Sequence, residues 1–273
     1  MQGPSTRSMP GWSFQTDGAC SVHRTLPEEV PVAVVFNGST LAVMMATPDD
    51  IADFAYGFAL SEGVITRPGE VESFEVVSHT QGTEARFWLR DDRAKVLSER
   101  RRIMAGPAGC GLCGIDSLEQ AMRPLPRVAD GSLCLSRTEV SGATEALRPR
   151  QALHAKTRAT HAAGFLVPGQ GIVLVREDVG RHNALDKLIG ALMRSGFDSA
   201  SGVAVMTSRL SVELVQKCAM SGIPGLVALS APTARAVHLA EEAGVTLVAF
   251  ARGGGFDIYS HAHRIADEVT NVA

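Results

Sequence analysis

The sequence predicts an α/β protein in which a smaller α+β domain precedes a layered α/β domain. In the second half, short and almost wholly apolar segments alternate with stretches of helical periodicity. This alternation is typical of strands that helices cover on both faces. In the first half, strand-like segments and turn residues surround one amphipathic stretch. A length of 273 residues is enough for one large domain or two modest ones.

We expect the first domain to span residues 19–130. Asn37-Gly38 predicts a hairpin turn between two strands. Thr47-Pro48-Asp49-Asp50 predicts a helix start, with a cap, a proline at the first position and acids in the first turn. Gln81-Gly82 indicates a second hairpin. The predicted strands are 30–36, 40–45, 71–78 and 85–90, and the helix begins near residue 47.

The second domain is expected over residues 131–273, after a linker that contains Pro124 and Pro126. Pro168-Gly169-Gln170-Gly171 predicts a hairpin, and regular strand and helix alternation follows it. Four helices are predicted: 137–147, 211–220, 233–243, and a further helix whose apolar stripe spans residues 184–192. The predicted strands are 164–167, 172–175, 203–206, 226–229 and 246–250.

Composition narrows the classes of function. A hydrophobic content of 45% and a charged content of 20% fit an ordinary globular core. A net charge of −3 argues against a general nucleic-acid partner. Five cysteines, an odd number, fit a reducing cytoplasm better than a disulfide framework. Residues 1–18 are polar, so we expect disorder there and no secretory signal, and no apolar run is long enough to span a membrane.

The most informative segment is the glycine-rich stretch 106–114, which contains Cys110 and Cys113. Glycine permits many backbone conformations, so we expect a mobile loop. Apolar residues at helical spacing follow, and a thiol at a helix N-terminus has a lowered pKa. We therefore interpret the pair as transfer cysteines. Two alternatives stay open: a thioredoxin-like redox pair, and half of a zinc site completed by His261 with His263 or by His154 with His161.

Four predicted strand ends of the second domain, those after residues 175, 206, 229 and 250, each carry an arginine. Ligands of open α/β sheets bind beyond the carboxyl ends of the strands, where arginines and helix N-termini attract anions. We therefore predict a ligand with more than one phosphate. Gly253, Gly254 and Gly255 allow close backbone approach, but no P-loop lysine follows them. The residues expected at this rim are Arg181, His182, Arg209, Arg235 and Arg252, whereas His161 and Cys218 are interpreted as packed structural residues.

Several of these segments together resemble the formate dehydrogenase accessory sulfurtransferase family (FdhD). The long run from Arg176 to Lys187 is the most specific of them. A departure is Arg158-Ala159, where smaller residues are expected. The segments that carry the resemblance are Cys110-Gly-Leu-Cys113-Gly, His161-Ala-Ala-Gly, Arg176-Glu-Asp-Val-Gly-Arg-His-Asn-Ala-Leu-Asp-Lys187, Ser230-Ala-Pro-Thr233 and Phe250-Ala-Arg-Gly253.

The resemblance implies a cytoplasmic homodimer whose second half is similar to the three-layer cytidine deaminase fold. It implies that Cys110 carries a persulfide. Our own hypothesis is that Cys113 is an assisting thiol that stabilises the persulfide or helps its release. The sulfur comes from a cysteine desulfurase and goes to molybdenum bis(molybdopterin guanine dinucleotide), which then enters apo formate dehydrogenase. No structural metal is implied. The implied cofactor-binding run is Phe250, Ala251, Arg252, Gly253, Gly254 and Gly255.

Two other functions compete with this one. A zinc-dependent deaminase needs His-x-Glu and Pro-Cys-x-x-Cys around a metal-bound water. The sequence has neither at the corresponding turns, which read Arg181-His182-Asn183 and Thr207-Ser208-Arg209. A non-catalytic chaperone that only holds the cofactor for formate dehydrogenase stays open, because binding and sulfur transfer would use the same arginines.

Overall fold

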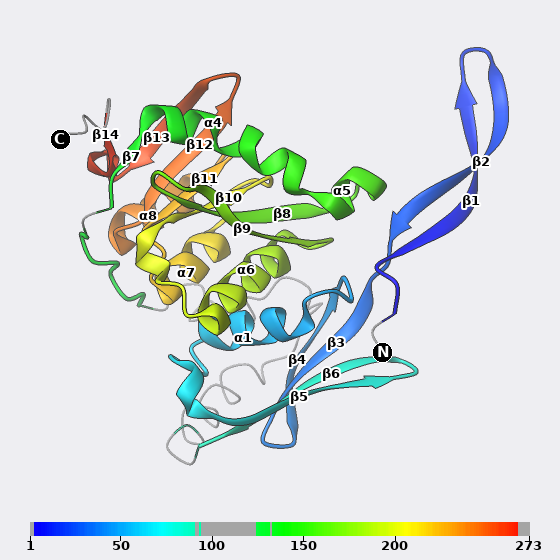
Figure 1. The fold of residues 1–273 in the computed structure, drawn as a ribbon, viewed down its shortest axis with the longest axis horizontal. Coiled ribbons are helices and arrows are strands. Elements are labelled where there is room, and N and C mark those ends of the chain that lie inside the picture. The colour runs from blue at the N-terminus through cyan, green and yellow to red at the C-terminus, as the bar shows by residue number, and fades with distance from the viewer. Residues whose placement is uncertain (1–2, 91–92, 94–123, 132, 267–273) are drawn as a thin grey trace.

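The structure is a computed structural model that describes residues 3–90, 93, 124–131 and 133–266. Cys110, Cys113 and the short helix expected after them lie outside the described residues. The described chain forms two main sheets with helices between and beside them, and a long ribbon at the N-terminus (Figure 1). No described helix has both the length and the apolar character that crossing a bilayer requires.

The first half contains a four-stranded sheet covered on one face by a helix. The strand order is β4-β3-β6-β5, with β3 parallel to β6 and the other pairs antiparallel. Both predicted hairpins are confirmed. The apolar face of the helix and the inner face of the sheet share one core, which includes Phe36, Phe54 and Phe87. The elements are β3 (Val30–Phe36), β4 (Ser39–Ala46), α1 (Ile51–Ser61), β5 (Val71–His79) and β6 (Gly82–Leu89).

The start of α1 differs from the prediction. The helix begins at Ile51, and Asp50 precedes it with a left-handed backbone (φ 56°) and no capping hydrogen bond from its side chain. Thr47 does not cap the helix because its backbone N–H and hydroxyl both donate to Asp178 in the second half, at 2.9 Å each. A long-range contact has therefore displaced the local capping pattern.

The second half is built on a six-stranded sheet of order β13-β12-β11-β10-β8-β9. The three strands β10, β11 and β12 are parallel, and the others pair antiparallel with their neighbours. The predicted short apolar strands are confirmed, and β13 was not anticipated. The strands are β8 (His161–Val167), β9 (Gly171–Asp178), β10 (Val203–Met206), β11 (Gly225–Ala228), β12 (Thr246–Arg252) and β13 (Gly255–Ser260).

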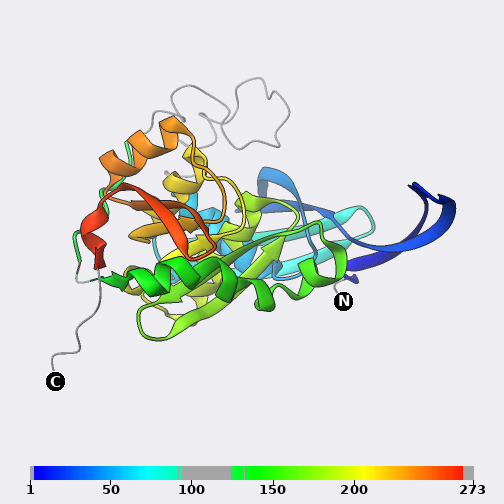
Figure 2. The same cartoon turned by 90° about the horizontal axis from the view of Figure 1, so that it is seen from above.

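Helices cover both faces of this sheet, so the predicted three-layer arrangement is confirmed (Figures 1 and 2). Successive strand residues alternate between the two cores: Phe165 packs with α6, α7 and α8, and Leu166 packs with α4. A short parallel pair, β7 (Leu135–Ser136) with β14 (Ile265–Ala266), joins the start of the second half to the C-terminal end of the described chain. The helices are α4 (Arg137–Leu147), α5 (Ala152–Thr157), α6 (Arg181–Ser195), α7 (Val212–Ser221) and α8 (Ala234–Ala243).

The N-terminal segment departs most from the sequence analysis. The expected disorder of residues 1–18 is wrong for residues 6–18, because β1 (Thr6–Gln15) and β2 (Gly18–Pro27) form a ribbon that projects from the body (Figures 1 and 2). Ten successive antiparallel pairs join the two strands. The polar composition suggested disorder, but cross-strand pairing orders the segment. Trp12 and Phe14 are largely exposed on the ribbon.

The two halves meet where α1 crosses α6. A Cβ atom on Gly57 would lie 1.8 Å from the backbone oxygen of Asp186, and a Cβ on Gly190 would lie 1.8 Å from that of Asp53. The two helices therefore touch backbone to backbone, and only glycine fits at either point. This crossing fixes how the first-half sheet sits against the second domain.

The crossing yields a direct stability prediction. Gly57→Ala should lower the free energy of unfolding by about 3 kcal/mol or more, because backbone atoms cannot move aside as side chains do. Gly142→Ala is the matched control, since Gly142 lies in α4 with nothing near its added Cβ. It should stabilise the protein by about 0.5–1 kcal/mol through helix propensity. Urea unfolding of both variants measures this, and equal midpoints would contradict the crossing.

Candidate functional site

The family-like run 176–187 makes buried contacts between the two halves. The fully buried ammonium of Lys187 lies 2.8 Å from the fully buried carboxylate of Asp178 and also donates to Thr47 of the first half. Arg176 and Arg194 both bind Asp53 of α1. Each ion pair satisfies charges that would be costly to bury alone. Much of the polar pattern of this run therefore serves the contact between the two halves.

A second buried pair extends this contact to α7. Lys217 on α7 lies 2.8 Å from both carboxylate oxygens of Asp186 on α6, and it also donates to Ser61 of α1 at 3.1 Å. Burial raises the pKa of Asp186, and the Lys217 ammonium acts in the opposite direction. Three helices from both halves are thus held in one register beneath the second sheet.

Glu177 connects the same run to the other side of the sheet. Its carboxylate accepts the backbone N–H groups of Leu153 and His154 at 2.7 and 2.8 Å, and the hydroxyl of Thr160 at 3.3 Å. An anion at the first turn satisfies donors that the helix cannot pair internally. Glu177 therefore fixes where α5 begins, and α5 forms one wall of a cavity.

The cavity has a volume of about 790 Å³ and opens at the carboxyl ends of the parallel strands. Thr207 follows β10, Leu229 follows β11 and Arg252 ends β12, as the strand-end rule predicts. The opposite wall is formed by α4, α5 and the turns next to them. The lining residues are Thr144, Glu145, Arg148, Gln151, His154, Ala155, Arg158, Ala159, Thr160, His161, Thr207, Leu229 and Arg252.

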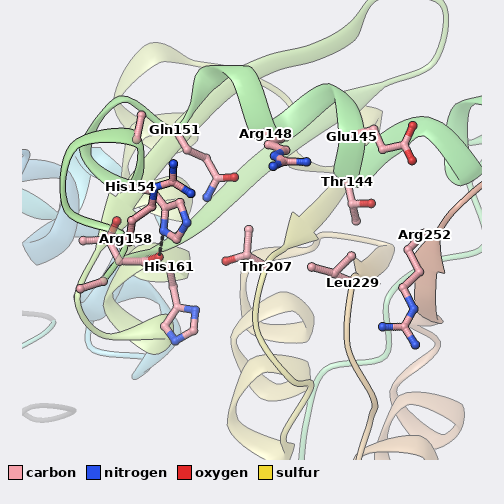
Figure 3. A pocket seen from close by; sticks show the side chains of 13 residues that line it. Thr144, Glu145, Arg148, Gln151, His154, Arg158, His161, Thr207, Leu229 and Arg252 are labelled. Carbon is pink, nitrogen blue, oxygen red and sulfur yellow. Dashed lines mark hydrogen bonds between the residues drawn. The ribbon is translucent and has the colours of Figure 1, made fainter. Parts of the chain in front are cut away.

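The cavity is cationic. Three arginines line it, with Glu145 as the single lining carboxylate. Figure 3 shows Arg158 beside the histidines at one end, Arg252 at the other, and Arg148 between them. Among the described residues, none of these arginines forms an ion pair. Guanidinium groups that form no ion pair can bind phosphate oxygens bidentately. The cavity therefore suits an extended anion with phosphates at both ends.

Arg252 is the predicted rim residue that lines the cavity. Arg209 and Arg235 are exposed at the same strand ends but are not among the lining residues. Arg181 and His182 open α6 and lie outside the lining as well. The structure therefore brings one of the four predicted arginines to the cavity.

The run Phe250–Gly255 forms the end of β12 and its hairpin with β13. Gly253 and Gly254 have φ values of 59° and 79°, which the tight turn requires, and Arg252 pairs with Gly255 across it. Phe250 also has a left-handed backbone (φ 54°) and is 36% exposed. Ala251 is buried, and its carbonyl accepts the Thr144 hydroxyl. The glycines thus have a structural role that does not depend on a ligand.

Sequence reasoning missed Arg148 and Arg158 as cavity residues. Arg148 belongs to a 3₁₀ turn, and Arg158 ends α5 with a left-handed backbone (φ 59°). Both elements precede the sheet, so the strand-end rule cannot find them. The departure noted at Arg158-Ala159 was the available signal. His161, interpreted as a packed structural residue, is half-buried and lines the cavity.

His161, which lines the cavity, and His182 near it have depressed pKa values. Burial lowers the pKa of His161, and the Arg181 cation lowers it further. Burial likewise lowers the pKa of His182 to about 4, with Arg181 and Lys217 acting in the same direction and Glu213 opposing them. His182 is therefore neutral at pH 7, and the cationic character of the region comes from its arginines.

The described part of the chain contains three cysteines, of which one is buried and two are exposed. Burial raises the pKa of Cys218 to about 12, which confirms its interpretation as a small buried hydrophobe. Cys20 and Cys134 are exposed, and neither lines the cavity.

The fold and the cavity define a two-part α/β protein with a cationic cavity at its parallel strand ends. Comparison with known proteins then gives its family. The FdhD/NarQ family model matches residues 27–266. The chain belongs to the FdhD/NarQ family.

Individual relatives cover nearly the whole chain. The sulfur carrier protein FdhD of Agrobacterium fabrum is 51% identical over 242 residues, 89% of each chain. That of Xanthomonas axonopodis is 44% identical over 272 residues, 97% of this chain and 96% of the relative. A crystal structure described as a formate dehydrogenase accessory protein from Desulfotalea psychrophila superimposes with a TM-score of 0.76. It covers 96% of this chain and 100% of its own at 22% identity, which supports the fold.

The depressed pKa of His182 can be measured directly. The imidazole carbon-bound proton shifts of His182 should titrate with a midpoint about 4 in an NMR pH series. The sign follows from burial, which disfavours the charged ring. A His182 midpoint near about 6.5, the ordinary value for histidine, would show that the ring is solvated and not packed beside α6 as described.

Proposed function

We propose that this protein is a sulfur carrier that moves persulfide sulfur from a cysteine desulfurase to the molybdenum bis(molybdopterin guanine dinucleotide) cofactor, for use by formate dehydrogenase. The observation that carries the proposal is the cationic cavity, because its size and charge suit a phosphate-bearing acceptor. The names of the relatives, which are sulfur carrier proteins, support the transfer role.

The acceptor is a substrate with a diphosphate in each dinucleotide arm. In this proposal, Arg148 and Arg252 bind phosphate oxygens, and Arg158 binds at the far end of the cavity. The exposed ring of Phe250 lies on the same strand as Arg252 and can stack on a guanine base. Arg181, His182, Arg209 and Arg235 stay predictions for parts of the ligand that extend along the strand ends.

Cys110 carries the sulfur in this proposal. Its thiolate attacks the terminal sulfur of the donor's persulfide, so a sulfur–sulfur bond forms on Cys110 while the donor's own bond breaks. The donor cysteine leaves as a thiolate with the electron pair, and no external oxidant or reductant is needed. Cys113 is the assisting thiol, close enough in sequence to stabilise the persulfide or help its release.

We also propose that the carrier is a homodimer that meets two proteins in turn, the desulfurase and apo formate dehydrogenase. The competing function is a chaperone that holds the cofactor without carrying sulfur. Both functions use the cavity, so only the fate of the sulfur separates them.

The role of the cavity arginines can be tested with guanosine diphosphate as the probe. Arg252→Ala and Arg148→Ala should each weaken binding about 10- to 100-fold, the loss expected for a hydrogen bond to a charged group. Lys156→Ala is the matched control, because Lys156 is an exposed cation of α5 outside the cavity lining. Calorimetric titration measures all three. If Lys156→Ala weakened guanosine diphosphate binding as much as the arginine variants do, the effect would come from overall charge and not from the cavity.

The carrier role predicts a persulfide on Cys110. After incubation with a cysteine desulfurase and cysteine, the wild-type chain should release cyanide-labile sulfur, and Cys110→Ser should release none. Cys20→Ser is the control, since Cys20 is an exposed thiol on the N-terminal ribbon. Full loading of the Cys110→Ser variant would place the carried sulfur on another cysteine, and a wild-type chain that releases no cyanide-labile sulfur would leave the chaperone function as the better account.

A further inference from the structure

Three metal-ligating side chains meet at a place that the proposed function does not use. Asp130 lies in the segment between the halves, and His261 precedes a 3₁₀ turn after β13 that contains His263. One donor atom from each of the three lies within 4.8 Å of the other two. None of them lines the cavity. The cluster joins parts of the chain that are distant in sequence, so spacing alone could not reveal it.

The distances suit a tetrahedral metal ion. With ligand bonds of about 2.0–2.1 Å, donor atoms around zinc are about 3.3 Å apart. His263 Nε2 lies 3.4 Å from the Asp130 carboxylate oxygen. The side chains of His263 and Asp130 are 57% and 64% exposed, so small rotations can bring all three donors to bonding distance.

Neighbouring residues position the donors. His261 has a left-handed backbone (φ 47°), and its ring meets that of His263 edge to face with centroids 5.8 Å apart. The buried Arg264 donates to Asp130 Oδ1 at 2.9 Å and to the Gly244 carbonyl at 2.9 Å. Contacts of this outer kind fix the orientation of a ligating carboxylate and raise metal affinity.

The charges around the cluster allow a dication. Arg264 contributes one positive charge, and Asp130 offsets it. Glu241 on α8 adds a second carboxylate 3.9 Å from His261 Nε2 and also accepts from that ring through its backbone oxygen at 3.0 Å. With neutral imidazoles, the local charge before metal binding is therefore negative.

We propose that Asp130, His261 and His263 bind one transition-metal dication of the zinc type. Imidazole and carboxylate ligands suit zinc, cobalt and nickel and disfavour the hard ions magnesium and calcium. The bound ion connects the segment before β7 to the turn before β14, next to the short pair that these two strands form.

The test uses the full chain without an affinity tag, stripped with a chelator, in which Cys110 and Cys113 are replaced by serine to remove thiol ligands. Zn²⁺ titrated into this protein should bind with one ion per chain and raise the melting temperature. Co²⁺ should give the visible absorption of a tetrahedral site without a thiolate charge-transfer band. Protons compete for imidazole nitrogens, so the affinity should fall in acid.

His263→Ala and Asp130→Asn, added to this background, should each weaken Zn²⁺ binding at least about 10-fold. His263 is exposed, so its loss leaves the fold intact, which circular dichroism checks. His238→Ala, an exposed histidine of α8 outside the cluster, is the control and should bind as the parent does. The absence of Zn²⁺ binding in the parent, or unchanged binding in His263→Ala, would overturn the proposal.

Discussion

The backbone contact between α1 and α6 is the constraint on which the arrangement of this protein depends. Because Gly57 and Gly190 have no side chains, the two helices approach until each glycine meets a carbonyl of the other helix. The buried ion pairs of Lys187 with Asp178 and Lys217 with Asp186 form around this contact. Removing a partner from such a pair leaves an uncompensated buried charge, so the pairs hold the two halves in one orientation.

The distribution of charge follows from this constraint. Cations of the run 176–187 and of α7 are paired with carboxylates inside the domain contact. On the opposite side of the sheet, the cavity arginines face a single lining carboxylate. Glu177 connects the two regions, because it lies in the motif and holds the start of α5. A rigid contact on one face thus supports a cationic cavity on the other.

Most of the fold could be predicted from the sequence, since apolar periodicity and turn residues are local signals. The hairpin at Asn37-Gly38 and the alternation of the second domain are examples. The N-terminal ribbon could not, because its order comes from cross-strand pairing in a polar segment. The strand-end rule found Arg252 but not Arg148 or Arg158, which reach the cavity from helices before the sheet. The use of Thr47 as a partner of Asp178 likewise needed the three-dimensional contact.

The proposed function requires that sulfur moves from the chain to a ligand held in the cationic cavity. Single-turnover transfer of radiolabelled persulfide sulfur from the loaded protein to added molybdenum bis(molybdopterin guanine dinucleotide) measures this step. We expect the label to leave the protein and to be recovered in the extracted cofactor, at a rate that depends on the cavity arginines. Retention of the label on the protein while the cofactor is bound would contradict it.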